Sequence, residues 1–185
     1  MIKKTLLILL ILFFNIQLKA EENIMILKLK NGDVIIKLFE ETAPNHVKRF
    51  KLLAKEKKYD GVIFHRVIDG FMAQTGDVKF GNSESKDFDL RRAGMGGSDL
   101  PDLKQEFNDV PHERGTLSMA RSSDPDSANS QFFICFDQAS FLDRQYTVFG
   151  KVIEGMEFVD KIKRGDSDNN GSVSDPDKII SFKSE

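Results

Sequence analysis

The hydrophobic pattern of the chain starts with two short runs that suit β-strands. Residues 24–30 alternate Ile and Leu with Met and Lys, and an apolar pattern returns over residues 34–39. Between these runs, Asn31 and Gly32 form a pair that is typical of a two-residue β-turn. The pattern therefore predicts an opening β-hairpin.

The spacing of apolar residues then changes to that of a helix. Val47, Phe50 and Ala54 recur three or four residues apart, which places them on one helical face. Thr42 precedes this segment as a candidate cap, and Pro44 is tolerated in a first helical turn. We expect a helix whose apolar face packs on the core.

Most of the later elements are predicted to be short strands. Candidates lie at residues 115–120, 131–136, 147–152 and 179–182, and a second short helix is expected around residues 156–162. Many short strands, two helices and no internal repeat favour an all-β barrel or sandwich. Closing such a sheet would also remove its exposed edges.

The stretch from Phe64 to Asp77 combines an apolar run with polar groups. Arg66 interrupts the run, and a guanidinium is costly to bury without a partner. A turn is predicted at residues 69–70, and it returns an aromatic ring, a thioether and an amide to the neighbourhood of Arg66. These three residues are Phe71, Met72 and Gln74. Such a cluster suits a pocket with apolar walls and a few orienting polar groups, although a hairpin with a surface arginine and core Phe and Met is the alternative.

The length and charge of the chain limit the classes of function. The 185 residues suit one domain, and the net charge is −2. Removing residues 1–20, which carry three lysines and no acid, makes the charge −5. Nucleic acid is therefore not expected as a partner, because phosphate binding needs concentrated Lys and Arg. Cys135 is the only cysteine, so no internal disulfide can form.

Residues 1–20 have the order of a secretory signal peptide. Two lysines precede an apolar run over residues 5–16, and a short polar segment follows before Glu21. The apolar run is short for a bilayer span of about 20 residues. We expect cleavage after Ala20, which would leave residues 21–185 as one periplasmic domain. Leu18 is larger than the small residue preferred near such a cut, so an uncleaved membrane anchor is the alternative.

Two other motifs and the histidines predict no metal or cofactor. The glycine-rich residues 94–98 are followed by Pro101 where a phosphate-binding loop would open a helix, so we expect a plain loop. Residues 166–177 have the oxygen-bearing positions of a calcium loop, but Asp177 replaces the usual Glu and Pro176 opposes an exit helix. We expect a solvated acidic loop there, with calcium binding as the alternative. The three histidines have neither metal spacing nor a motif-paired nucleophile.

Four blocks of the sequence resemble the cyclophilin-type peptidyl-prolyl cis-trans isomerases. The first is the run FHRVIDGFMAQTGD at residues 64–77, and the others are residues 115–121, residues 129–135, and residues 141–143 with 146–150, in the family's order. The likeness extends over residues 24–182. It implies a closed, eight-stranded antiparallel barrel with a helix over each open end, although the hydrophobic pattern alone indicates fewer strands.

The resemblance also implies a role for each matching residue. Arg66 matches the catalytic arginine. The pocket for the proline ring would be formed by Phe71, Met72, Phe133 and Leu142. The substrate backbone would be held by Gln74 and Gln131, and it would lie along Ala120 and the backbone of Arg121.

Three positions of the site depart from the pattern of many family members. Phe141 stands where many eukaryotic members have Trp, which removes an indole N–H donor and predicts weak binding of the macrocyclic inhibitor cyclosporin. Tyr146 replaces a frequent His, and Arg121 replaces a frequent Asn. We expect catalysis to survive all three changes.

The function implied is the acceleration of rotation about X-Pro bonds. The substrates would be proline-containing peptides and unfolded exported proteins, and we expect the enzyme to be a monomer without a cofactor. At the twisted geometry the prolyl nitrogen becomes basic, and Arg66 would donate a hydrogen bond to it. The alternative is a docking or chaperone module that uses the same groove without turnover.

Overall fold

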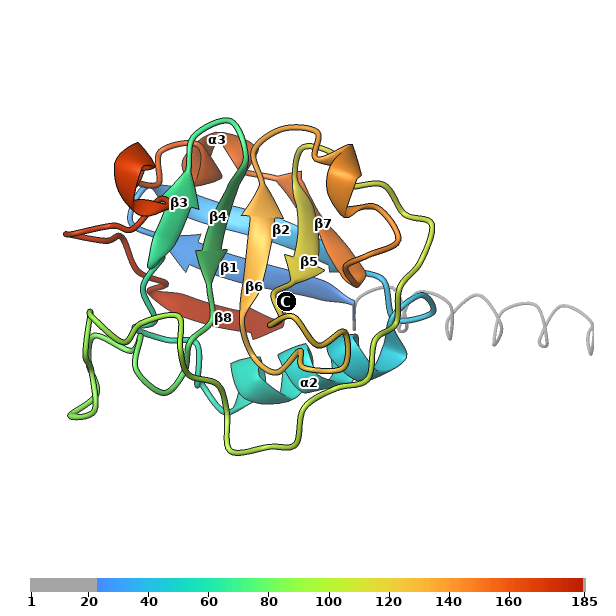
Figure 1. Ribbon diagram of the computed structural model, residues 1–185, viewed down its shortest axis with the longest axis horizontal. Helices are drawn as coiled ribbons and strands as arrows, with labels where there is room; N and C mark the ends of the chain where they lie inside the picture. The colour runs from blue at the N-terminus through green and yellow to red at the C-terminus, as the bar shows by residue number, and fades with distance from the viewer. Residues whose placement is uncertain (1–22, 185) are drawn as a thin grey trace, which may run out of the picture.

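Eight strands of the computed structural model form a single antiparallel sheet (Figure 1). The structure describes residues 23–184, so the predicted signal peptide lies outside the described residues. The strands follow the order β3-β4-β6-β5-β7-β2-β1-β8 across the sheet. Their bounds are β1 Ile24–Leu29, β2 Gly32–Leu38, β3 Arg66–Ile68, β4 Met72–Thr75, β5 Thr116–Met119, β6 Phe132–Cys135, β7 Val148–Glu154 and β8 Ser181–Ser184. The all-β prediction is confirmed, and the later strands lie within two residues of their predicted bounds.

The first two strands form the hairpin that the pattern predicts. Leu29 lies opposite Gly32 across the turn, and the pairing continues to Ile24 and Lys37. Alternate residues of β1 are buried, as expected for a strand with one face on the core. The Asn-Gly turn therefore sets the register of this hairpin.

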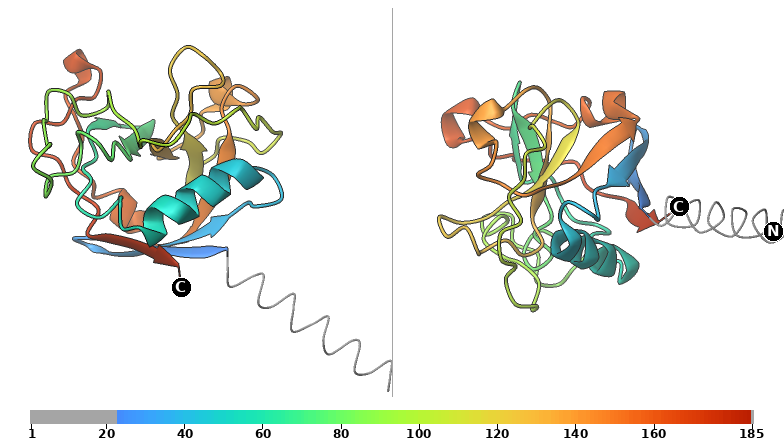
Figure 2. Two further views of the ribbon diagram at one scale, coloured as in Figure 1. Left: turned by 90° about the horizontal axis from the view of Figure 1, so that it is seen from below. Right: turned by 90° about the vertical axis from the view of Figure 1, so that its right-hand side faces the viewer.

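Among residues 23–184, two α-helices lie at opposite ends of the sheet (Figures 1 and 2). They are α2 Pro44–Lys55, which packs against β8, and α3 Met156–Val159, which lies beside β2. Two short 3₁₀ helices, η1 Ser140–Leu142 and η2 Ser167–Asn169, interrupt the later loops. In the part of the chain that the structure describes, no helix is both long and apolar enough to cross a bilayer.

The start of α2 differs from the prediction. Ala43, not Thr42, occupies the cap position, and its side chain cannot accept a hydrogen bond. The carboxylate of Glu106 instead accepts hydrogen bonds from the backbone N–H groups of Asn45 and His46, at 3.1 Å each. A residue distant in sequence thus satisfies the free amides of the first turn.

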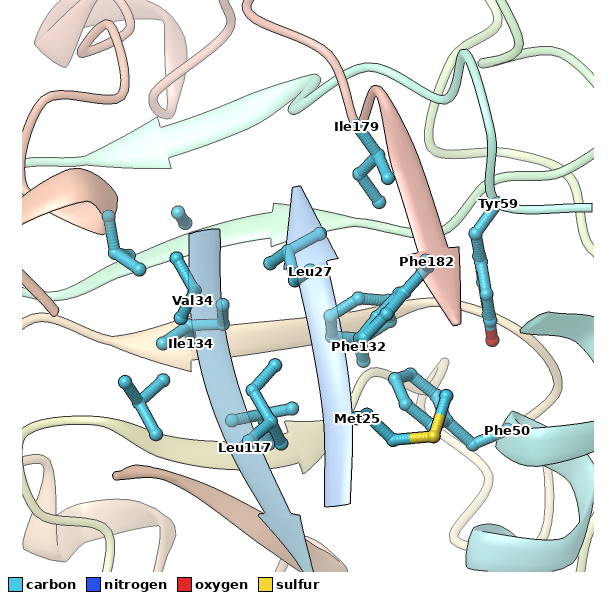
Figure 3. Packing of buried hydrophobic residues seen from close by; sticks show 14 of the residues in the cluster. Met25, Leu27, Val34, Phe50, Tyr59, Leu117, Phe132, Ile134, Ile179 and Phe182 are labelled. Carbon is cyan, nitrogen blue, oxygen red and sulfur yellow. The ribbon is translucent and has the colours of Figure 1, made fainter. Parts of the chain in front are cut away.

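The buried face of α2 contributes the centre of an aromatic core (Figure 3). Phe50 is fully buried, and its ring centroid lies 4.9–5.3 Å from those of four other aromatic residues. These are Tyr59, Phe132, Phe149 and Phe182. Tyr59 follows α2 in the chain, and the other three rings come from β6, β7 and β8. The Phe50 ring therefore packs the helix against both halves of the sheet.

The sheet curls into an open half-barrel, so the prediction of a closed barrel is met only in part (Figure 2). β3 and β8 are the outermost strands, and no ladder joins them. The segments that precede these two strands are linked by backbone hydrogen bonds of 2.8–2.9 Å between residues 61–64 and 177–179. We call this link the seam. β3 has only three residues, and its outer edge meets a loop instead of another strand.

Candidate active site

The hairpin of β3 and β4 places Arg66 directly opposite Gln74. The turn at residues 69–70 includes Gly70, whose φ of +68° is the left-handed conformation that glycine adopts without strain. The same register puts Ile68 opposite Met72. The prediction that the chain returns Met72 and Gln74 to the side of Arg66 is therefore confirmed.

The guanidinium of Arg66 is half-buried and is held by two amide-bearing residues. Its Nη1 donates to Gln74 Oε1 at 3.2 Å. Its Nε donates to the backbone oxygen of Asn170 and its Nη2 donates to Asn170 Oδ1, both at 3.0 Å. Burial lowers the pKa of Arg66, but a guanidinium keeps its charge at any ordinary pH.

A pocket of about 290 Å³ opens beside this guanidinium. Ten of the eleven residues that were predicted for the site from the sequence line this pocket. They are Arg66, Phe71, Met72, Gln74, Ala120, Arg121, Phe133, Phe141, Leu142 and Tyr146. The guanidinium lies on the surface formed by these aromatic and amide side chains, and not on the opposite side of the sheet. Gln131, the eleventh residue, lines the neighbouring cavity of about 470 Å³.

The pocket has a buried floor and an aromatic rim. Met72, Phe133 and Leu142 are each less than 9% exposed, whereas Phe141 is 64% exposed. Phe141 packs against Phe71 with ring centroids 5.3 Å apart. An open concavity of this size with an apolar floor suits a small ring such as that of proline.

A chain of amides links Arg66 to the glycine-rich loop. Gln74 Nε2 donates to Gln131 Oε1 at 3.0 Å, and Gln131 Nε2 donates to the backbone oxygens of Gly94 and Gly96 at 2.9 and 2.8 Å. Both N–H groups of the Gln131 amide are thus used within the protein. The segment at residues 94–98 is a loop, as predicted, and it forms one wall of the larger cavity.

Arg121 lines both cavities, and its side chain hydrogen-bonds to the loop after β5 and to the loop after η1. Its Nη1 donates to the backbone oxygen of Ser122 at 2.8 Å, and its Nη2 donates to that of Gln145 at 3.0 Å. Its guanidinium carbon lies 4.4 Å from the centroid of the Tyr146 ring, a cation–π contact. Among residues 23–184, no ion pair neutralises either Arg121 or Arg66.

Beneath the pocket lies an arrangement that resembles a Ser-His-Asp triad. His112 Nδ1 is 2.9 Å from Asp143 Oδ1, and His112 Nε2 is 3.0 Å from Ser118 Oγ. Ser118 and His112 are fully buried, and Ser118 Oγ also donates to the backbone oxygen of Thr147. Burial lowers the pKa of His112. Because no substrate can reach Ser118, this network supports the pocket floor instead of supplying a nucleophile.

The acidic residues at both ends of the calcium-like stretch are engaged in other contacts. Asp166 Oδ1 accepts from the backbone N–H of Asp168, and Asp177 pairs with Lys30. In the described part of the chain, no group of three or more His, Cys, Asp or Glu side chains is placed to hold a metal ion.

The sequence reasoning missed Asn170 as part of the site. The pair Asn170-Gly171 predicts a turn, but the same residues also fit the calcium-loop pattern, which does not point to Arg66. The contact between Asn170 and Arg66 joins residues 104 positions apart. No spacing rule for one sequence predicts a contact at that separation.

The chain is similar to known proteins over nearly all its described length. Residues 24–184 match the family model described as cyclophilin type peptidyl-prolyl cis-trans isomerase/CLD. A probable peptidyl-prolyl cis-trans isomerase from Brucella suis is 60% identical over 159 residues, which cover 86% of this chain and 81% of that protein. A peptidyl-prolyl cis-trans isomerase from Acinetobacter baylyi is 38% identical, with 85% and 82% covered.

Solved structures agree with the sequence comparison. A cyclophilin from Hirschia baltica has a TM-score of 0.73 at 27% identity, covering 89% of this chain and 74% of that one. A cyclophilin-type peptidyl-prolyl cis-trans isomerase from Cryptosporidium parvum, crystallised in the presence of the dipeptide Ala-Pro, has a TM-score of 0.74 at 28% identity. That match covers 88% of this chain and 98% of that one.

Proposed function

The chain belongs to the cyclophilin-type peptidyl-prolyl cis-trans isomerases and is an isomerase, and from this premise we propose that the pocket beside Arg66 is its active site. Family membership favours the enzyme over the alternative of a docking module without turnover. The observation that carries the proposal is the position of the Arg66 guanidinium, which keeps two N–H groups free of partners among the described residues, beside a pocket whose floor is formed by buried apolar side chains.

The chemical task is to lower a rotational barrier. Resonance gives the peptide C–N bond double-bond character, so rotation meets a barrier of roughly 18–20 kcal/mol. The two isomers of an X-Pro bond differ by only about 0.5–1 kcal/mol, so both are populated although they exchange slowly. A catalyst needs to stabilise only the twisted state between them.

Arg66 is the catalytic residue in this proposal. In the twisted state the prolyl nitrogen is pyramidal and basic, and it can accept a hydrogen bond that neither planar isomer accepts. An interaction made only in the transition state accelerates the reaction directly. Asn170 and Gln74 take three of the five N–H groups of Arg66, which leaves two for the substrate. Stabilisation by about 6 kcal/mol, shared with the desolvating walls, would give on the order of 10⁴-fold.

The other residues that were predicted for the site bind the substrate in this proposal. We assign Phe71, Met72, Phe133 and Leu142 to the proline ring, with the rim completed by Phe141 and Tyr146. Gln74, Ala120 and Arg121 line both cavities, so a peptide backbone can pass along them from one cavity to the other. The Ala-Pro dipeptide named for the Cryptosporidium parvum structure supports proline-containing peptides as ligands. Gln131 can meet the backbone only through its oxygen, because both its N–H groups are engaged.

A proline tetrapeptide assay tests the catalytic assignment. We expect wild type to accelerate cis-to-trans exchange, and Arg66→Ala to lower kcat/KM by on the order of 10²-fold or more. Arg91→Ala is the matched control, because it removes the same charge from a side chain that is 90% exposed and lines neither cavity. Equal activity of wild type and Arg66→Ala would overturn the assignment.

We further propose that the enzyme assists the folding of exported proteins in the periplasm. The support is the signal-like order of residues 1–20, with cleavage after Ala20 releasing residues 21–185 as the mature domain. Cell fractionation with N-terminal sequencing tests this. A periplasmic protein beginning at Glu21 supports it, and a membrane-bound protein retaining residues 1–20 supports the anchored alternative. A cytoplasmic protein that retains Met1 contradicts both.

Three finer properties belong to the same proposal. The mature enzyme is a monomer. Its affinity for cyclosporin is weak, because Phe141 lacks an indole donor. The backbone hydrogen bonds of the seam close the barrel between the segments that precede β3 and β8. Gel filtration, titration with cyclosporin and amide hydrogen exchange at Ile179 test these in turn. Exchange at Ile179 as fast as in an exposed loop would contradict closure at the seam.

A further inference from the structure

The outer edge of β3 is covered by a loop from the far end of the chain, residues 165–173, which we call the edge loop. The backbone N–H of Gly165 donates to the oxygen of Val67, and the N–H of Val67 donates to the oxygen of Gly171, both at 2.8 Å. Arg66, the first residue of β3, is therefore flanked by β4 on one side and by the edge loop on the other.

Within the edge loop, Asn170 contacts one side of the Arg66 guanidinium with two oxygens. Its backbone oxygen accepts from Nε and its Oδ1 accepts from Nη2, both at 3.0 Å. Gln74, from the opposite flank, accepts from Nη1 at 3.2 Å. The planar group is thus held from both sides, and its free N–H groups are one on each Nη.

The conformation of the edge loop brings both oxygens of Asn170 to the same side. Asn170 has a φ of +51°, a left-handed conformation that asparagine tolerates better than most residues. The next residue, Gly171, has a φ of +77°, and a Cβ there would lie 2.5 Å from Ile68 Cγ1. The backbone N–H of Gly171 donates to the backbone oxygen of Asp166 at 2.8 Å. These contacts fix the loop without using the Asn170 side chain.

The chemistry of the two flanking side chains matters as much as their position. Gln74 and Asn170 both present neutral amide oxygens, which orient the guanidinium and leave its charge intact. A carboxylate at either place would form an ion pair and compete for the charge that the prolyl nitrogen needs. Among residues 23–184, no ion pair to Arg66 is formed.

We propose that Asn170 is a positioning residue for catalysis, which holds the Arg66 guanidinium at the pocket rim through its backbone oxygen and Oδ1 without neutralising it. The inference rests on the proposed catalytic role of Arg66. It extends the functional unit from the β3–β4 hairpin to the edge loop, about 100 residues further along the chain.

Asn170→Gly is the most informative variant. Glycine adopts the same left-handed φ without strain, so the variant removes Oδ1 but keeps the backbone contact and the loop. We expect kcat to fall about 10-fold, the scale of one hydrogen bond to a charged group, with KM changed less than about 2-fold. Asn169→Gly is the matched control, because it removes the same side chain one position earlier, where no contact with Arg66 exists.

A double-mutant cycle separates positioning from a general effect on folding. In an Arg66→Lys background, a single ammonium cannot engage both oxygens in the same way, so Asn170→Gly should change kcat less than about 2-fold. An equal loss in both backgrounds, or a loss in the Asn169→Gly control as large as in Asn170→Gly, would overturn the inference.

Comparison with Arg66→Ala in the same assay distinguishes this inference from the proposal on which it rests. If Arg66→Ala is as active as wild type, the catalytic role of Arg66 fails and the positioning role fails with it. If Arg66→Ala is inactive while Asn170→Gly keeps the wild-type kcat, the positioning inference alone is overturned.

Discussion

The burial of His65 predicts that the fold loses stability in mild acid. The residue is 7% exposed, and neither ring nitrogen has a hydrogen-bond partner among the described residues. Burial lowers the pKa of His65 to about 4, although Asp77 lies close enough to raise it in part. The unfolded chain would bind a proton near pH 6.5, so between these two values the unfolded state binds protons that the folded state excludes.

The magnitude follows from the two pKa values. Stability from this residue is fully present above pH 6.5 and falls as the pH drops toward 4. A shift from 6.5 to about 4 corresponds to a total of about 3 kcal/mol, of which about 2 kcal/mol would be lost by pH 5. Burial also lowers the pKa of His46 and of His112, so the whole protein should lose more than His65 alone accounts for.

Urea unfolding of wild type and His65→Gln at several pH values tests this prediction. Glutamine cannot titrate, so the stability of wild type should fall by about 2 kcal/mol more than that of the variant between pH 7.5 and pH 5. Between pH 7.5 and pH 8.5 the two curves should run parallel, which is the internal control. Parallel curves down to pH 5 would refute the reasoning, because His65 would then be protonated equally in both states.

Two further predictions concern the core and the pocket rim. Phe50→Ala should lower the free energy of unfolding by about 3–5 kcal/mol, because it opens a cavity among four aromatic rings, and urea unfolding at pH 7.5 measures it. A loss below about 1 kcal/mol would show that the rings repack. Phe141→Trp should tighten cyclosporin binding by about 5- to 10-fold through one added N–H donor, as measured by calorimetric titration. Unchanged affinity would contradict the proposal that the missing indole donor at this rim position weakens cyclosporin binding.

Local patterns predicted the elements whose geometry depends on neighbouring residues. The Asn31-Gly32 pair set the register of the first hairpin, and the turn at residues 69–70 brought Gln74 back to Arg66. The prediction of α2 needed only the helical spacing of its buried residues. In each case the sequence signal and the structural constraint lie within about ten residues of each other.

The predictions that differed from the structure all depended on distant parts of the chain. Glu106 caps α2 in place of Thr42, although 60 positions separate it from His46. Asn170 reaches Arg66 from the edge loop, and the seam joins the segments before β3 and β8 without a ladder. Such contacts depend on how the sheet curls, and hydrophobic periodicity carries no information about that curvature.

The pocket residues were predicted because the resemblance supplied what spacing could not. Residues of β3, β4, β6 and η1 meet around one pocket, although they are up to about 80 positions apart in the chain. Composition alone would have left Phe71 and Met72 as ordinary core residues. The structure shows that they line the pocket together with Arg66, which is the arrangement that the mechanism requires.

The central claim is that Arg66 acts on the twisted state and contributes little to the binding of either planar isomer. Exchange spectroscopy by NMR on a proline tetrapeptide at equilibrium, with wild type and with Arg66→Ala, measures the isomerisation rate and the peptide affinity in the same samples. We predict that the variant loses on the order of 10²-fold or more in exchange rate while its Kd stays within a few-fold of wild type. An exchange rate that is unchanged, or one that falls only in proportion to a loss of affinity, would contradict the account.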